Sequence, residues 1–301
     1  LSTILGWNLM LTNIVIGTLV TIYTLVGGTE AVSQTQKQQM IVIFIGMFLA
    51  FFLILENLPL DLNDALLYSG AMGKINPVSF EFDMNNRYNI WSAFLGGTFL
   101  FLSYFGTDQS QVQRYLTGKS LKEARLGLLF NGLFKIPMQF FILFIGVMVF
   151  VFFQFEKTPL NFNPLSENLK NNAQYQKFNS EFDQLHLDKK EKIAEWKNGH
   201  SETVMAELKV LQAKEVTIRE DVKKLIDEKA PEIESNDKDY VFIYYILNYL
   251  PTGIVGLLIA VILSAAMSST SSELNALATT TVVDIYKRNF APNISEKKYL
   301  N

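Results

Sequence analysis

Five long apolar stretches, separated by polar connections, constrain the fold of this chain more than any other feature. Each is about 20 residues or longer, which is enough for an α-helix to cross a bilayer. Lipid offers no hydrogen-bond partners to the backbone, so such segments must be helical. The sequence therefore predicts an all-α membrane protein. We expect its spans at residues 4–26, 36–55, 90–113, 126–155 and from Gly253 onward, with Gly27-Gly28 ending the first.

The composition narrows the class further. Hydrophobic residues make up 49% of the 301 residues, although one long segment is highly charged. The chain has no cysteine, which excludes disulfides and thiolate metal sites, and both histidines, His186 and His200, lie in the charged segment. Without histidine, cysteine or paired carboxylates in the spans, we do not expect an enzyme. The basic loop at 114–125 is explained by membrane topology, so we expect no nucleic-acid partner.

Polarity divides the chain into three parts. Residues 1–155 form a transmembrane core of four spans with a polar loop at 56–87, which should hold a short helix near 60–68. Residues 156–239 are charged, and residues 240–301 contain a short aromatic helix followed by the last span. The basic residues at 114–125 and 287–288 both belong on the cytoplasmic side, which places 156–239 outside the cytoplasm. The chain has no initiating methionine, and we interpret it as an internal piece of a longer protein.

The charged segment predicts a helical hairpin. Residues 173–196 and 201–229 carry apolar residues at helical spacing, and Asn198-Gly199 between them favours a turn. We expect the two apolar faces to pack on each other and the mixed charges to be solvated. Its partner is unknown. A long connection of this kind should be dispensable for the function of the spans.

Hydroxyl groups cluster inside the last apolar stretch, at Ser264 and then at Ser268, Ser269, Ser271 and Ser272. One interpretation is a packing face, in which each hydroxyl bonds to a carbonyl one turn earlier. The other is an ion site, because hydroxyl and carbonyl oxygens are the ligands of a hard cation. The residues alone do not decide between the two.

Two further spans carry unusual polar groups. The third contains Gly96-Gly97 and continues into Tyr104–Gln109, which is typical of a broken helix beside a binding site or of a kinked packing helix. The fourth carries Lys135. A charge within a span is costly and is a functional candidate, although this lysine could also extend to the inner interface.

Two strings resemble the sodium/solute symporter family. They are Ala-Ala-Met-Ser-Ser-Thr-Ser-Ser-Glu-Leu-Asn with the following Asp-Ile-Tyr-Lys, and Tyr-Phe-Gly-Thr-Asp-Gln-Ser-Gln-Val-Gln-Arg-Tyr-Leu. The second is also similar to the monocarboxylate, multivitamin and iodide branch. The resemblance implies an inverted-repeat, amino-acid-transporter-type helical bundle, of which this piece holds core helices four to eight, with the hairpin as an extramembrane insertion. It also implies a multi-pass protein of the plasma membrane, or of the inner membrane in a bacterium.

The resemblance further implies a function and its residues. It implies symport of a small organic solute (a sugar, sialic acid or an organic anion), with sodium as the coupling ion and the bilayer as environment. The sodium ligands would be Ala265, Ser268 and Ser269. The substrate and its inner gate would involve Tyr104, Phe105 and Lys135. The alternative function is a membrane sensor that uses the symporter fold as a ligand switch and the hairpin as a partner-binding module.

A second sodium site is in doubt. Its implied ligands are Gln36, Ser271 and Ser272, but the family has an aspartate where this chain has Gln36. A neutral amide cannot offset the charge of a buried ion. We therefore predict one sodium ion per substrate.

Overall fold

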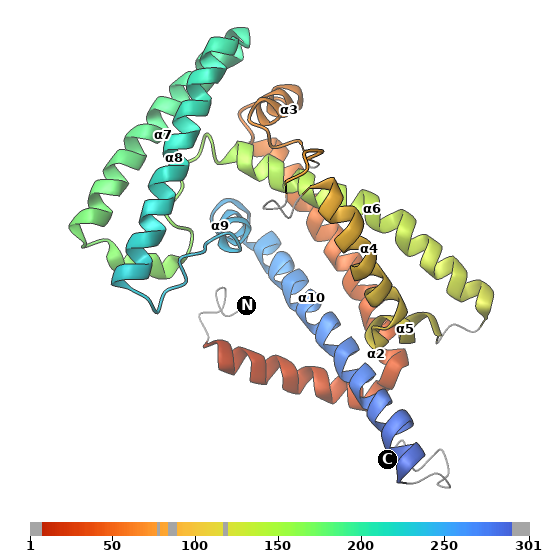
Figure 1. The fold of residues 1–301 in the computed structure, drawn as a ribbon. Helices are drawn as coiled ribbons and strands as arrows, with labels where there is room; N and C mark the ends of the chain where they lie inside the picture. The colour runs from red at the N-terminus through yellow and green to blue at the C-terminus, as the bar shows by residue number, and fades with distance from the viewer. Residues whose placement is uncertain (1–7, 77–78, 84–88, 117–119, 291–301) are drawn as a thin grey trace. The chain divides into compact units, whose positions relative to one another are not determined.

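The computed structural model describes residues 8–76, 79–83, 89–116 and 120–290, and Figure 1 shows their ribbon. Apart from an isolated bridge between Ser79 and Asn89, the regular elements of these residues are helices. The chain forms two compact units. The first comprises Leu1–Met47, Val78–Phe140 and Gly256–Asn301, and the second comprises Phe48–Pro77 and Phe141–Val255.

The helices follow one another along the chain. They are α2 (Leu9–Asn57), α3 (Leu62–Ala71), α4 (Ile90–Gly106), α5 (Gln109–Leu116), α6 (Leu121–Phe152), η1 (Pro164–Leu169), α7 (Ala173–Gly199), α8 (Glu202–Lys229), α9 (Tyr240–Tyr249), α10 (Thr252–Thr279), η2 (Thr280–Tyr286) and α11 (Lys287–Asn289). Three helical stretches are long and apolar enough to span a membrane: Ser33–Asn57, Leu121–Phe152 and Thr252–Asn289. Leu9–Ile22 and Ile90–Gly106 are shorter apolar helices. The expectation of an all-α membrane protein is confirmed at this level.

The predicted end of the first span at Gly27-Gly28 is wrong. The helical hydrogen bonding continues through both glycines, so α2 is one helix of 49 residues. Figure 1 shows that α2 changes direction between its red and orange parts. Glycine is tolerated inside a helix as well as after one, so the pair alone does not fix where a helix ends. The predicted start of this span at residue 4 lies outside the described residues.

The third span is broken, which is one of the two forms that its polar residues allowed. The helix runs through Gly96-Gly97 and ends at Gly106, where Thr107 Oγ1 donates to the carbonyl of Ser103 at 3.0 Å. Asp108 then caps α5, because its Oδ1 accepts hydrogen bonds from the backbone N–H and the hydroxyl of Ser110. The break therefore lies at 107–108, and α5 is a separate short helix.

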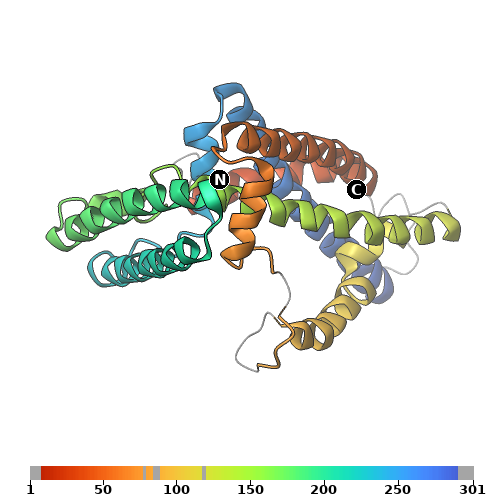
Figure 2. The same ribbon diagram turned by 90° about the horizontal axis from the view of Figure 1, so that it is seen from above.

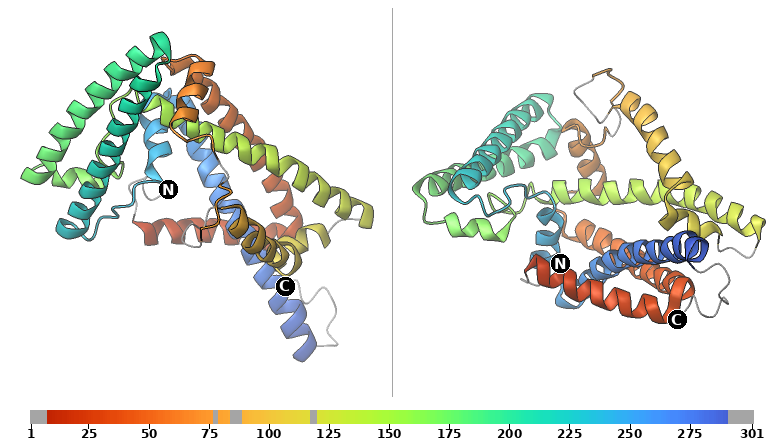
Figure 3. Two further views of the ribbon diagram at one scale, coloured as in Figure 1. Left: turned by 45° about the horizontal axis from the view of Figure 1, so that its top comes forward. Right: turned by 60° about the horizontal axis from the view of Figure 1, so that its bottom comes forward.

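Within the first unit, α2 and α10 approach closely at Gly46. A Cβ atom on Gly46 would lie 2.9 Å from Leu258 Cδ2 and 3.0 Å from Val261 Cγ2, so a larger residue here would require these side chains to shift. Phe44 of α2 packs edge-on against Phe134 of α6, with ring centroids 5.3 Å apart. A π-helical segment interrupts the last span near its end. Its final turns form the π-helix η2 and then α11, which continue the line of α10 in both views of Figure 3.

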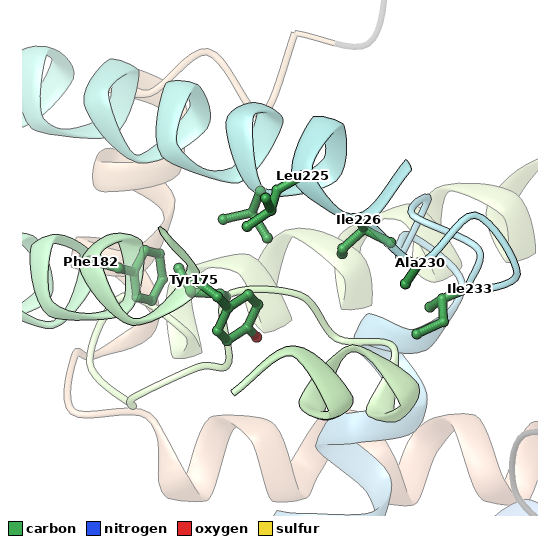
Figure 4. Close-up of a cluster of buried hydrophobic side chains, with 8 residues drawn as sticks. Tyr175, Phe182, Leu225, Ile226, Ala230 and Ile233 are labelled. Carbon is green, nitrogen blue, oxygen red and sulfur yellow. The ribbon is translucent and has the colours of Figure 1, made fainter. Parts of the chain in front are cut away.

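The hairpin of the second unit matches its predicted form. Helices α7 and α8 run alongside each other (Figures 1 and 2), and most of the expected apolar faces are buried. Figure 4 shows part of this core, where Tyr175 and Phe182 of α7 lie close to Leu225 and Ile226 of α8. The turn differs from the prediction by one or two residues. The left-handed residue is His200 (φ 48°), and Gly199 still belongs to α7.

Side-chain amides close the base of the hairpin. Asn161 Nδ2 donates to the carbonyl of Ser235 at 2.9 Å, and Asn163 Nδ2 donates to that of Glu234 at 2.9 Å. The carboxylate of Asp237 accepts the N–H of Phe162 at 2.9 Å. Each amide is buried and paired, so the segment that enters the hairpin and the segment that leaves it are fixed together.

Candidate ion and substrate site

The polar cluster of the last span meets α2 inside the first unit. Gln36 Nε2 donates to Ser272 Oγ at 2.7 Å and to the backbone carbonyl of Ser268 at 3.3 Å. Ser271 and Ser272 are buried. The structure therefore brings together the three residues of the doubtful second ion site, Gln36, Ser271 and Ser272, and the Gln36 amide N–H group points at the Ser272 hydroxyl and the Ser268 carbonyl.

The hydroxyls also bond within their own helix. The carbonyl of Ser268 accepts Ser271 Oγ at 3.0 Å and Ser272 Oγ at 3.1 Å, in addition to Gln36. Thr270 Oγ1 donates to the carbonyl of Ala266 at 3.0 Å. This is the local pairing that a packing face would show, so the hydroxyls are stable without an ion. This carbonyl already accepts three side-chain donors, which offset its negative partial charge, so it is not a free cation ligand in this arrangement.

The other three predicted sodium ligands lie on one turn of α10. Ser269 Oγ donates to the carbonyl of Ala265 at 3.4 Å, which is a long hydrogen bond. Ala265 and Ser269 are exposed, whereas Ser268 is half-buried. The carbonyl and the hydroxyl are thus close enough to bind one cation, and their exposed side leaves room for ligands from another segment.

The predicted substrate residues also meet within the first unit. Lys135 Nζ of α6 lies 5.2 Å from the ring centroid of Tyr104 in α4, in a cation–π arrangement. The ring of Phe105 packs edge-on against Tyr104 at 5.0 Å. Among the residues that the structure describes, no carboxylate forms an ion pair with Lys135. Its charge therefore lies in an apolar helix with an aromatic face as its neighbour.

Two features near the break between α4 and α5 were not predicted. Gln113 Nε2 of α5 donates to Thr279 Oγ1 of α10 at 3.1 Å, which links the string at 104–116 to the last span. A cavity of about 320 Å³ lies beside Phe105, where α5 and α6 meet, and Gln111 and Asn131 are among its polar lining residues. Polar residues at 111–113 were visible in the sequence, but which helix they would contact was not.

Polar groups that meet inside apolar helices, beside a broken helix, are typical of membrane transport proteins. The comparison with protein families makes this class specific. The family model described as "Sodium:solute symporter family" matches residues 1–177 and 224–301. The chain belongs to this family, and it is part of a multi-pass integral membrane protein. The family consists of transporters, in agreement with the expectation that the chain is not an enzyme.

Curated relatives show the same class. The human sodium/iodide cotransporter is 34% identical over 157 residues, which are 51% of this chain and 24% of the relative. The mouse sodium-coupled monocarboxylate transporter 2 is 34% identical over 131 residues, 44% of this chain and 21% of the relative. The rabbit sodium-dependent multivitamin transporter is 33% identical over 126 residues, 42% of this chain and 20% of the relative. The matched part thus covers a quarter of these relatives or less. No solved structure matches the chain.

Proposed function

We propose that the protein containing this chain is a sodium-coupled symporter of a small anion that works by alternating access. Family membership supports sodium coupling. Relatives named for iodide and for monocarboxylates support an anionic solute over a sugar. The proposal of an anionic substrate rests mainly on the contact between Lys135 and Tyr104.

Lys135 needs a partner to make its position favourable. A lysine at the centre of a span costs about 2.5 to 3.5 kcal/mol on insertion scales. A cation–π contact returns about 0.5 to 2 kcal/mol, so Tyr104 does not offset this cost. An anionic solute beside Nζ would supply the missing counter-charge. A neutral sugar would accept a hydrogen bond from Nζ but leave the charge uncompensated.

For the coupling ion, we propose Ala265, Ser268 and Ser269 as sodium ligands on α10. Sodium loses its water in such a site only if several oxygen atoms replace it. Here the Ala265 carbonyl and the Ser269 hydroxyl, 3.4 Å apart, would supply two of them. The resemblance assigns the remaining ligands to the family's first core helix. Sodium would then favour the conformation in which the helices close together, and a substrate that prefers the same conformation would bind cooperatively.

We propose that a single sodium ion is coupled to each substrate. The amide N–H of Gln36 donates to Ser272 Oγ at 2.7 Å, so this group occupies the place where a second ion would need to bind. Turning the amide would present its oxygen instead, but Gln36 would still carry no charge. One ion per monovalent anion would make transport electroneutral.

The orientation of the spans is also a proposal. Lys122 and Arg125 in the first turns of α6 and Lys287 and Arg288 at the end of the last span would lie in the cytoplasm. Residues 156–239 would then lie outside it, on the outer face of the plasma membrane or on the periplasmic face of a bacterial inner membrane.

Uptake into proteoliposomes tests this function with the full-length protein. We expect an inward sodium gradient to drive accumulation of labelled iodide or a short monocarboxylate, but not of a neutral sugar. Lys135→Met should abolish uptake at normal expression, and Lys135→Arg, which keeps the charge, should retain part of it. Equal uptake by Lys135→Met and the parent protein would refute the anion assignment. Uptake that does not depend on sodium would refute the coupling.

A further inference from the structure

Helix α3 is held between two other parts of the second unit, and Tyr68 is the junction. Its side chain is completely buried, and its hydroxyl donates to Gln154 Oε1, just after α6, at 3.5 Å. The ring of Trp196, in the last turn of α7, packs edge-on against that of Tyr68 at 5.6 Å. Burial raises the pKa of Tyr68, and the negative charge of Glu215 raises it further, so the phenol stays a neutral donor. Tyr68 therefore contacts both the end of α6 and the tip of the hairpin.

The tip of the hairpin makes two polar contacts with the same segment. His200 Nε2 lies 3.0 Å from Asp64 Oδ1 in the first turn of α3. Lys197 Nζ donates to the carbonyl of Pro59, just before α3, at 3.2 Å. The His200 ring also packs against Trp196, at 4.7 Å between centroids. Residues 196–200 thus bind α3 through an aromatic ring and an imidazole, and the segment just before α3 through an ammonium group.

A backbone feature fixes this arrangement. His200 adopts a left-handed conformation (φ 48°) that favours glycine, and its N–H is bonded to the carbonyl of Trp196. A histidine at such a position carries a conformational cost, and the contact of its ring with Asp64 offsets part of it. A glycine would make the same turn without reaching α3.

We propose that the hairpin tip, residues 196–200, is a permanent clamp that holds α3 against the end of α6. The clamp joins the segment after α2, which contains α3, to the segment after α6. These two segments would then move as one body while the rest of the protein changes conformation. The family model does not match residues 178–223, so the clamp lies outside the part common to the family. The proposal concerns the second unit and does not depend on which solute is carried.

Chemical cross-linking tests whether the clamp is permanent. The chain has no cysteine, so an introduced pair would be unique within these 301 residues. In a full-length protein free of other cysteines, Asp64→Cys/His200→Cys should be joined by a short bifunctional methanethiosulfonate reagent. The yield should be the same with and without sodium, and uptake should be unchanged. The control pair Asp64→Cys/Leu187→Cys should not react, because Leu187 lies 13 residues earlier on α7, about 20 Å away.

Two outcomes would overturn the proposal. A yield no higher than that of the control pair would mean that the tip does not contact α3. A cross-link that forms but blocks uptake until it is reduced would mean that the tip must open during transport.

A second variant separates the clamp from the fold of the hairpin. His200→Gly keeps the left-handed turn and removes the ring that reaches Asp64. By hydrogen–deuterium exchange of the full-length protein, we expect amides of α3 to exchange about tenfold faster, with α7 and α8 unchanged or slower. Unchanged exchange in α3 would contradict the clamp. Trp196→Phe, which keeps an aromatic ring against Tyr68, is the matched control and should change α3 little.

Discussion

Glu215 lies between two cations inside the hairpin, and replacing it by glutamine measures what that charge contributes. Its Oε2 lies 2.5 Å from Lys189 Nζ, and its Oε1 lies 3.0 Å from Arg219 Nε. Lys189 also donates to Gln212 Oε1 at 2.8 Å, and its side chain is 4% exposed. Burial lowers the pKa of Lys189 while Glu215 opposes that shift. Burial alone would raise the pKa of Glu215, but Lys189 and Arg219 together bring it below its usual value.

Glu215→Gln keeps the shape of the side chain and removes the charge that both cations share. Lys189 would then be a buried cation with only neutral acceptors. Leaving a buried charge without its partner costs about 3 to 5 kcal/mol. At about 1.4 kcal/mol per factor of ten, even the lower figure corresponds to a population of the open hairpin more than 100 times larger. Arg219 retains other partners, because it also bonds to the carbonyls of Pro159 and Leu160.

Hydrogen–deuterium exchange of the purified full-length protein measures this change directly. The slowest amides of α7 and α8 should exchange at least 100-fold faster in Glu215→Gln, while those of α10 should not change. The matched control is Lys189→Met/Glu215→Leu, which removes both charges and should recover most of the protection, because apolar residues of similar size often replace a buried pair at little cost. Less than a threefold change in Glu215→Gln would refute the reasoning.

Three further predictions concern pH and the ion. Burial, with Lys189 and Lys190 nearby, lowers the pKa of His186, so the hairpin should be fully stable above about pH 6.5 and less stable below it. His186→Gln should remove this loss of stability, measured by hydrogen–deuterium exchange at pH 7.5 and 5.5. An identical loss of stability in the variant would contradict the prediction. Ser269→Ala should raise the sodium concentration for half-maximal uptake about tenfold, equivalent to about 1.4 kcal/mol, with Ser264→Ala as a control that leaves it unchanged. The Hill coefficient for sodium should be near 1 and should rise in Gln36→Asp, which places a carboxylate beside Ser272; a parent value near 2 would show that a second ion already binds.

The period of the apolar residues predicted the hairpin well. Its core depends largely on contacts between α7 and α8, which follow each other in sequence. Phe182, Ile193, Leu208 and Val222 are buried as that pattern requires. The turn was displaced because His200, not glycine, takes the left-handed position, where its ring contacts Asp64 as well as Trp196. No local signal in the hairpin indicates a residue 136 positions away.

The spans and the candidate site were less predictable in detail. Gly27-Gly28 was expected to end a helix, and α2 continues through it because glycine suits either conformation. The polar residues of the third span allowed either a broken or a kinked helix, and the position of the break at 107–108, where Thr107 and Asp108 cap the flanking helices, was not predicted. The residues of the site could be named from the two strings, but the pairing of Gln36 with Ser272 depends on how α2 meets α10. That contact joins residues 236 positions apart.

The nearly equal lengths of the two hairpin helices, α7 and α8, determine how far the tip of the hairpin extends from its base. Of α7, residues 178–199 lie outside the family match, and of α8, residues 202–223, so each arm extends beyond it by the same number of residues. When two antiparallel helices are lengthened by the same number of residues, the base of the hairpin does not move, and the apolar residues of one helix still face those of the other. The extension of each arm beyond the match gives a reach of about 33 Å at the helical rise per residue. The length of the arms therefore determines whether the tip of the hairpin reaches α3. Arms shorter by one or two turns could keep the same kind of core but would stop short of α3.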